Sequence, residues 1–324
     1  MLRISLFVAS VALFSGCTLN RPFQNQSVNT APVAFQGVPT MDQVVQVVNG
    51  NTDRVRQLQS SGATLAVEGL PALQTTMALE RPNRFRLQSG LRLTGGNELD
   101  LGSNDEHFWF WAKRNRPPAL FFANHQEFQA GSQNTILPLS PQWLIEALGL
   151  VRMEPGQQHS GPYAHAAGRI QVRSQIPQPG GELTRILVID AANGSILEHY
   201  VYDQSGTLLA SALGSRHQYD TVTGVSLPRE VSVKLPPAQL SFTIRTDGYL
   251  INQLSASEQL WTIPEIPGTQ SVDLMRMGNA MLGASESPSG RKILRGQQAT
   301  RQRPLKRFVT SLLSEMRQGL EAKR

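Results

Sequence analysis

The chain has 324 residues, of which 40% are hydrophobic, and a formal net charge of +6. This length and apolar content support one large domain or two small ones with a packed core, and a single cysteine excludes an internal disulfide framework. The basic excess is local, because residues 285–324 contain ten Lys/Arg and three Asp/Glu, whereas the rest contains 20 basic and 21 acidic residues.

The first 16 residues are typical of a bacterial lipoprotein signal peptide. Arg3 is positively charged, Ile4 to Phe14 form an apolar run too short to span a bilayer permanently, and the small pair Ser15-Gly16 precedes Cys17. We predict that residues 1–16 are removed and that Cys17 carries a diacylglycerol and a further acyl chain such as palmitate, which anchors the protein to a membrane. The alternative is an ordinary secretory signal followed by an unmodified cysteine.

Residues 17–40 are predicted to form a flexible tether, because they are polar, contain three prolines and lack periodicity. Thr18 rather than Asp follows the cysteine, which argues against retention in the inner membrane. The predicted location is therefore the outer membrane, facing the periplasm.

A helix is predicted to open the folded part. Thr40 and Gln43 have the spacing of a capping box, and apolar residues recur at helical spacing as far as Leu58. After Gly62 the apolar residues recur at every second position. This period predicts strands with one solvent-exposed face around residues 63–67, 85–88, 231–235 and 240–245.

Turn residues separate the strands of the second half at close intervals. They are Asn193-Gly194, Ser205-Gly206, Thr223-Gly224, Pro236-Pro237 and Asp247-Gly248. Strands joined this tightly must be antiparallel, so we predict a meander. Ser140 to Gly149 interrupt the strands with a cap, a proline at the first helical position and a glycine stop, which predicts a short helix.

Two predicted strands, Phe108-Trp109-Phe110-Trp111 and Ile186 to Ile189, are apolar at every position, so both of their faces need cover. A curved antiparallel sheet with helices on its concave face, leaving an apolar hollow, would supply that cover. A filled two-layer core would supply it equally well.

The residues Glu80-Arg81-Pro82-Asn83-Arg84-Phe85-Arg86, followed by Asp105-Glu106-His107 and the aromatic strand, resemble the bacterial lipoprotein-localisation (LolA/LolB-like) proteins, a periplasmic carrier and its outer-membrane receptor. The resemblance continues in order through residues 137–149, 188–195 and 261–273, and it covers residues 41 to 275. It implies a mainly β fold (α+β), an incomplete antiparallel barrel closed by helices around a cavity for acyl chains. The implied domain is residues 41–277.

The same resemblance implies roles for individual residues. Arg81 would hold a helical lid by hydrogen bonds, or else be a solvated strand arginine. Phe108 and Phe110, or Trp109 and Trp111, would line the hollow. The inward face of the lid would consist of Trp143, Leu144, Ile145 and Leu148, whose alternative role is core packing. Cys17 matches the anchored receptor, whose protruding apolar loop has only Pro117-Pro118-Ala119-Leu120 as a candidate here.

Enzyme motifs such as GxSxG, HExxH, a P-loop and GxGxxG do not occur in the sequence. Glu98 and Asp100 share a strand face, but we interpret them as solvated charges rather than a catalytic pair, and His159 and His165 as solvated rather than metal-bound. We therefore expect no catalytic residues, no metal and no cofactor.

The tail from residue 278 to 324 divides in two. Residues 285–303 are basic and aperiodic, whereas Pro304 onward predicts an amphipathic basic helix. Its apolar stripe consists of Leu305, Phe308, Leu312, Met316 and Leu320. The helix either contacts an anionic membrane or a partner, or docks on the protein's own domain, and an exported location argues against nucleic acid.

Two functional hypotheses follow from the sequence. In the first, a monomeric, lipid-anchored envelope protein binds acyl chains of lipids or lipoproteins in an apolar cavity and serves their sorting or transfer. In the second, a structural envelope lipoprotein has a filled core, and its basic tail binds an anionic surface or a protein partner.

Overall fold

The computed structural model describes residues 30–67, 71–91, 96–113, 118–130, 142–165, 168–178, 181–255 and 257–276. Cys17, the signal segment, most of the tether and the whole tail with its stripe (Leu305, Phe308, Leu312, Met316 and Leu320) lie outside the described residues. Within the described ranges, no helix has the length and hydropathy that a membrane span requires.

The described part is mainly β. Its strands are β1 Gln57–Val67, β2 Leu73–Glu80, β3 Arg84–Gly90, β4 Asn97–Ser103, β5 His107–Ala112, β6 Ala119–Asn124, β7 Gln158–His165, β8 Arg169–Gln178, β9 Gly181–Asp190, β10 Ile196–Tyr202, β11 Leu208–Asp220, β12 Val225–Leu235, β13 Leu240–Thr246, β14 Leu250–Ile251 and β15 Gln270–Asp273. The helices are α1 Met41–Asp53, α2 His125–Ala130 and α3 Gln142–Ala147, with short 3₁₀ turns η2 Pro236–Ala238 and η3 Glu258–Trp261.

All strands belong to one 15-stranded sheet in the order β15-β6-β5-β4-β3-β2-β1-β13-β12-β11-β10-β9-β8-β7, with β14 beside β1. Two antiparallel meanders, β1 to β6 and β7 to β13, join through the antiparallel pair β1–β13. The pair β6–β15 is parallel. Because β7 and β15 end opposite edges, the sheet is not closed into a barrel. The mainly β prediction is confirmed, whereas the arrangement is mixed rather than purely antiparallel.

The N-terminal helix begins as predicted and ends earlier than predicted. The Gln43 side chain accepts from Thr40 N at 2.8 Å, and Gln43 N donates to the Thr40 hydroxyl at 3.3 Å, which completes the capping box. The helix ends at Asp53, and β1 begins at Gln57, so Leu58 is a strand residue and the period of two starts before Gly62. The prediction from spacing failed here because Val55 lies in the turn before β1 and Leu58 in β1 itself, and both are buried there without being helical.

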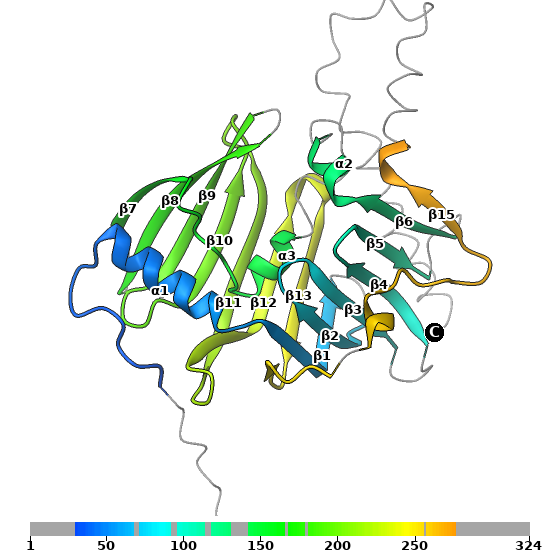
Figure 1. Cartoon of the computed structure of the whole chain (residues 1–324), viewed down its shortest axis with the longest axis horizontal. Helices are drawn as coiled ribbons and strands as arrows, with labels where there is room; N and C mark the ends of the chain where they lie inside the picture. Colours follow the sequence, from blue (N-terminus) through cyan, green and yellow to red (C-terminus); the bar gives the residue numbers. More distant parts are fainter. Residues whose placement is uncertain are drawn as a thin grey trace, which may run out of the picture.

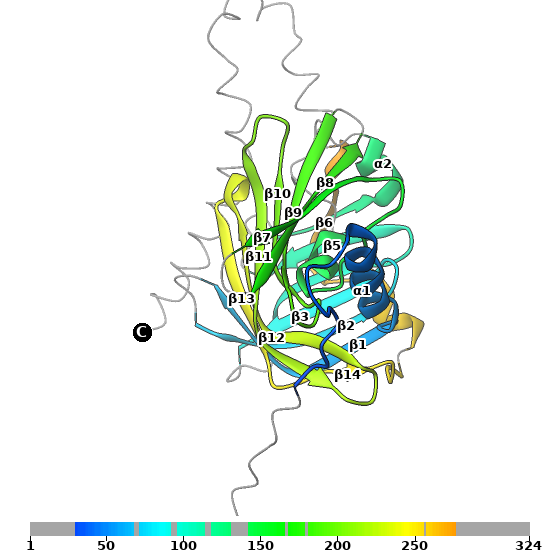
Figure 2. The ribbon, with the colours of Figure 1, turned by 90° about the vertical axis from the view of Figure 1, so that its left-hand side faces the viewer.

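The strand register defines an inner face that carries α1 and α3, since directly opposed residues in a sheet point to the same side. Its rows comprise Leu187, His199, Ala212, Val233, Phe242 and Val67 in one half, and Met77, Leu87, Leu101, Phe110 and Phe121 in the other. Figures 1 and 2 show the sheet bending, with α1 across β8 to β10 and α3 in front of β12 and β13. The opposite side is called the outer face.

Apolar side chains join each helix to this inner face. Val44 and Val48 of α1 pack with Val172, Leu187 and Ile189 in one cluster. Helix α3 belongs to the largest cluster, which spans β1 to β3 and β10 to β13. It ends at Ala147, and the predicted stop, Gly149, follows with a φ of +88°, which glycine adopts readily, and an N–H that donates to Glu146 O.

Four of the five predicted turns lie between consecutive strands of the second meander, whereas Asp247-Gly248 lies between β13 and β14, which both pair antiparallel with β1. The carboxylate of Asp190 accepts from Ala192 N and Asn193 N, and that of Asp220 accepts from Val222 N and Thr223 N. These side-chain bonds replace strand pairing where the chain reverses. The antiparallel meander is therefore confirmed.

Candidate functional site

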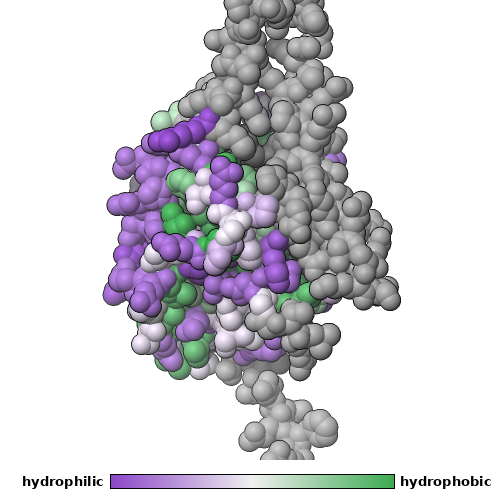
Figure 3. Space-filling view, turned by 90° about the vertical axis from the view of Figure 1, so that its right-hand side faces the viewer, coloured by the Kyte–Doolittle hydropathy of each residue, from purple (hydrophilic) through white to green (hydrophobic). Residues whose placement is uncertain are grey.

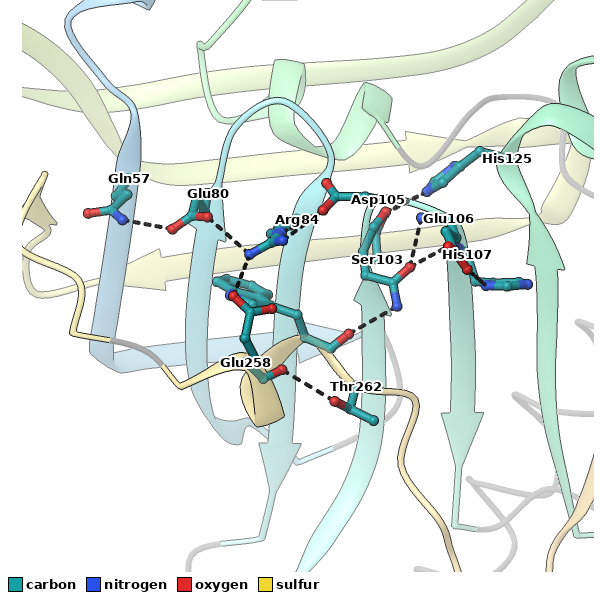
Figure 4. A network of polar contacts seen from close by, with 12 residues as sticks. Gln57, Glu80, Arg84, Ser103, Asp105, Glu106, His107, His125, Glu258 and Thr262 are labelled. Carbon is teal, nitrogen blue, oxygen red and sulfur yellow. Dashed lines mark hydrogen bonds and ion pairs between the residues drawn. The ribbon is translucent and has the colours of Figure 1, made fainter.

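The two parts of the resemblance motif meet at one end of the sheet, as Figure 4 shows. Arg84 Nε donates to Asp105 Oδ2 at 2.9 Å, and Arg84 Nη1 lies 3.1 Å from Glu258 Oε1 and 3.3 Å from Glu80 Oε1. Gln57 extends the network to β1 by donating to Glu80 Oε2 at 2.7 Å. The carboxylates of Asp105 and Glu258 are exposed, so each pair contributes only about 0–1 kcal/mol.

Arg81 is partly buried and contacts the end of α1. Its Nη1 donates to Thr52 O at 2.6 Å and to Val55 O at 3.2 Å, and its Nη2 lies 3.7 Å from Asp53 Oδ1. Burial lowers the pKa of Arg81, and the neighbouring Asp53 opposes that change. A guanidinium here satisfies carbonyls at the C-terminal end of a helix, where positive charge is favourable. These contacts are with α1, and not with the helix of Trp143 that we predicted as the lid.

The outer face carries a buried polar network in which Asp100 is the centre. Asp100 Oδ2 accepts from Arg86 Nη2 at 2.6 Å and from Gln88 Nε2 at 2.9 Å, while Oδ1 accepts from Trp109 Nε1 at 3.1 Å. Arg86 also donates to the carbonyls of Leu260 and Thr262, at 2.9 and 3.0 Å. The network therefore fastens the segment around η3 to the sheet.

The interpretation of Glu98 and Asp100 as solvated charges is wrong. The exposed fractions of these residues are 5% and 3%. Glu98 Oε1 accepts from Lys113 Nζ at 3.1 Å, and Asp100 is paired with Arg86. The segment around η3, far away in the sequence, covers the strand face near Asp100, and alternation within β4 did not reveal that cover.

The two aromatic pairs of β5 lie on opposite faces, and the register decides which is which. Phe108 opposes Ala123 and Phe110 opposes Phe121 on the inner face, whereas Trp109 and Trp111 point to the outer face. Both faces are covered, as predicted for an apolar strand. Trp109 and Trp111 pack with Leu120, Phe122, Ile263 and Ile266. Figure 3 shows polar and apolar side chains intermixed on the exposed surface at this end of the sheet.

The predicted lid and cavity residues fall into separate clusters. Trp143, Ile145 and Leu148 are buried in the largest cluster, and Leu144 packs against it. Phe108 packs instead with Phe128 of α2, with ring centroids 5.1 Å apart in a T-shaped arrangement. The structure thus brings α3 onto the inner face but places Phe108 against α2 and Phe110 beside Phe121 of β6.

Beneath α3 lies a polar group that sequence reasoning missed. Arg185 of β9 and His199 of β10 are 2% and 1% exposed, and both contribute to the inner face. Glu146 of α3 lies over them, with Oε2 at 3.7 Å from both Arg185 Nη1 and His199 Nε2. The sequence did indicate the burial of Arg185, because alternation in the strand places it on the same face as Leu187 and Ile189, which are buried.

Two pockets border the C-terminal half of α1. One, of about 510 Å³, is lined by residues 31–34, by α1 and by the β11–β12 turn. The other, of about 760 Å³, is lined by Asp53, Arg54, Arg56, Gln57, Glu80, Arg81 and Asn252. Neither of these two pockets is lined by α3 or by the aromatic residues of β5.

Two further expectations concern a loop and metal ligands. Ala119 and Leu120, part of the candidate protruding loop, are buried in β6 with 3% exposure each, so this candidate is wrong for the described part, residues 118–120. His159 contacts the Ser174 hydroxyl at 2.8 Å and Glu154 O at 3.1 Å. Among the described residues, no group of three or more His, Cys, Asp or Glu side chains is placed to hold a metal ion.

No family model matches the sequence, and no curated protein matches it. Among solved structures, the chain is similar to a domain from Vibrio parahaemolyticus named as a candidate outer-membrane lipoprotein-sorting protein, with TM-score 0.46, 9% identity and coverage of 67% of this chain and 95% of that one. It is also similar to a DUF1329 family protein from Desulfovibrio piger, with TM-score 0.44, 11% identity and coverage of 72% and 98%.

A third similar structure is a LolA superfamily protein from Nitrosomonas europaea, with TM-score 0.42, 9% identity and coverage of 68% and 97%. Structural matches to the LolA superfamily and to a lipoprotein-sorting domain are thus present at low sequence identity. Because these TM-scores lie below 0.5, no functional conclusion is drawn from them.

Proposed function

We propose that this chain is a lipid-anchored protein of the bacterial outer membrane that binds acyl chains of lipids or lipoproteins on the inner face of its sheet. It sorts or transfers these chains without enzymatic chemistry. The observation that carries the proposal is the cover of the inner face. A separate six-residue helix, α3, and the turn after it supply Trp143, Ile145 and Leu148 to the largest apolar cluster.

In this proposal an acyl chain enters between α3 and the sheet, and α3 shifts outward but stays over the bound chain. Separating three buried apolar side chains from the sheet would cost at most roughly 5–9 kcal/mol, at about 1.5–3 kcal/mol each. Burying about 14 CH₂ groups of an acyl chain would return roughly 11 kcal/mol, at about 0.8 kcal/mol per group. The two quantities are similar, as reversible exchange between a closed and a loaded state requires.

The anchor is supported by the sequence before the folded part. A lipidated Cys17 followed by the tether 17–40 would place the domain a short distance from the membrane. Several acyl chains on one cysteine would hold it there longer than a single chain.

The second candidate function is a structural envelope lipoprotein with a filled core. It is favoured by the packing of Trp143, Ile145 and Leu148 in the largest apolar cluster, and by the position of the two pockets along the C-terminal half of α1. In that case the basic tail supplies the binding function.

Native mass spectrometry distinguishes the two candidates. The mature chain, residues 17–324 with Cys17→Ser, carries no lipid of its own. Reproducible co-purified acyl lipid, together with uptake of an apolar fluorescent probe, is expected for the first function. A clean protein mass under gentle conditions without probe uptake would reject it in favour of the second.

A further inference from the structure

The polar group beneath α3 lies within apolar surroundings. It consists of Trp143 and Glu146 from α3, Arg185 from β9 and His199 from β10, and we call it the inner polar cluster. Trp143, Arg185 and His199 are 6%, 2% and 1% exposed, and the Glu146 side chain is 23% exposed. The Trp143 and His199 rings are 5.7 Å apart. Buried polar groups of this kind normally have hydrogen-bond partners.

Several atoms of the cluster lack such partners. Arg185 Nη2 donates to Arg152 O at 3.1 Å and to Gln157 Oε1 at 2.9 Å, but its Nε has no partner. Trp143 Nε1 and both ring nitrogens of His199 also have none. Glu146 Oε2 lies 3.7 Å from Arg185 Nη1 and from His199 Nε2, which is too far for a hydrogen bond.

The unpartnered atoms of the cluster include more hydrogen-bond donors than acceptors. Burial, with the nearby Arg185 charge, lowers the pKa of His199 to about 3, so the imidazole is neutral and one nitrogen donates. The indole of Trp143 and the Nε–H of Arg185 are donors only. The unpartnered atoms are thus mainly donors, and they call for an acceptor from outside the chain.

Charge and surroundings restrict the acceptor. Glu146 already faces Arg185, so an anionic ligand would bring a second carboxylate to one guanidinium. The neighbouring inner-face residues Leu187, Val201 and Ala212 are apolar and at most 3% exposed. A neutral carbonyl oxygen attached to a hydrocarbon chain meets both conditions.

We propose that the inner polar cluster binds the neutral carbonyl of an acyl ester or amide, with the Trp143 indole N–H as a direct donor, while the hydrocarbon chain follows the apolar inner face. This inference rests on the proposed function and adds which group of the ligand the protein recognises, namely the carbonyl. Ester-linked and amide-linked acyl chains share this carbonyl.

The test measures binding to the mature chain, residues 17–324 with Cys17→Ser, labelled with ¹⁵N at its four tryptophans. The probes are methyl decanoate, N-methyldecanamide, sodium decanoate and dodecane. Trp143→Phe keeps an aromatic ring but removes the N–H together with part of the ring volume. The matched control is Trp109→Phe on the outer face, where the indole already donates to Asp100 at 3.1 Å.

We expect the ester or the amide to bind more tightly than dodecane and decanoate, and to shift the Trp143 indole signal. Trp143→Phe should weaken ester binding roughly three- to ten-fold while sparing dodecane, as loss of one neutral hydrogen bond predicts. Both variants lose the same ring volume, so Trp143→Phe should lower the melting temperature without ligand less than Trp109→Phe does, because its indole N–H has no partner to lose. Trp109→Phe should lower the melting temperature and keep the ester preference.

Four results would overturn the inference. Equal binding of ester and dodecane, or an ester preference that survives Trp143→Phe, would leave acyl binding intact and remove the cluster from recognition. A fall in the melting temperature of Trp143→Phe without ligand as large as that of Trp109→Phe would show that the indole is satisfied by buried water. Binding of none of the four probes would reject the proposed function itself.

Discussion

Asp100→Asn tests the buried network of the outer face. The substitution keeps the side-chain volume but removes the charge opposite Arg86, in a pair whose side chains are 8% and 4% exposed. Asp100 accepts three hydrogen bonds, and an amide group in its place would turn one acceptor into a donor that faces other donors.

The expected magnitude follows from the burial of the pair. Removing one partner of a buried ion pair leaves an uncompensated charge and typically costs about 3–5 kcal/mol. The free energy of unfolding of a domain is only about 5–15 kcal/mol, so Asp100→Asn should remove a large part of it. Urea unfolding of the mature chain, followed by far-ultraviolet circular dichroism, measures the loss.

Glu230→Gln is the matched control. Glu230 pairs with Arg245 at 3.0 Å, but the Arg245 side chain is 57% exposed, so the loss should stay below about 1 kcal/mol. If Asp100→Asn also lowers the free energy of unfolding by less than about 1 kcal/mol, water reaches the network and the reasoning from its burial is wrong.

Four further predictions concern the anchor, α1, a buried histidine and the tail. Cys17→Ser should release the protein from membranes without changing its melting temperature, and tight association after an alkaline wash would contradict the lipid anchor. Arg81→Leu removes the donor to Thr52 O and Val55 O at the end of α1, so stability should fall by roughly 0.5–3 kcal/mol while acyl uptake, which depends on α3, stays unchanged; altered uptake kinetics would show that Arg81 also controls the movement of α3. Because the pKa of His199 is lowered to about 3 from 6.5, its contribution to stability is complete above pH 6.5 and declines as the pH falls towards 3. Urea unfolding between pH 4 and 7 should therefore give a free energy of unfolding that depends less steeply on pH for His199→Phe than for the unsubstituted chain. Equal pH dependence of the two proteins would refute this. Deleting residues 304–324 should weaken sedimentation with anionic vesicles at low salt and spare neutral vesicles, whereas a lower melting temperature after the deletion would place the apolar stripe on the protein's own domain.

Local chemistry explains the predictions that were confirmed. The capping box of Thr40 and Gln43, the stop at Gly149 and the turns between the later strands depend on residues within a few positions of each other. Tight turns also dictate antiparallel neighbours, so the meander could be predicted from the sequence. The extension of the first helix to Leu58 failed because Val55 and Leu58 occupy positions that a helix and a strand can both bury.

Long-range packing decided the rest. Alternation in β5 separates Phe108 from Trp109, but only the register with β6 and the cover by residues 258–266 assign each pair to a face. Asp100 looked solvated because Arg86 and the η3 segment are remote in the sequence.

The sequence by itself determined the start of α1, the short helix α3 and the tight turns of the antiparallel meander, since each depends on short-range chemistry, and the lipid signal at Cys17 stays a prediction. Only the tertiary structure decided that the sheet stays open, that Arg81 contacts α1, and that Arg185 and His199 lie together beneath Glu146. The physical reason is that burial and pairing depend on which distant strand or helix covers a side chain, and no local period records that cover.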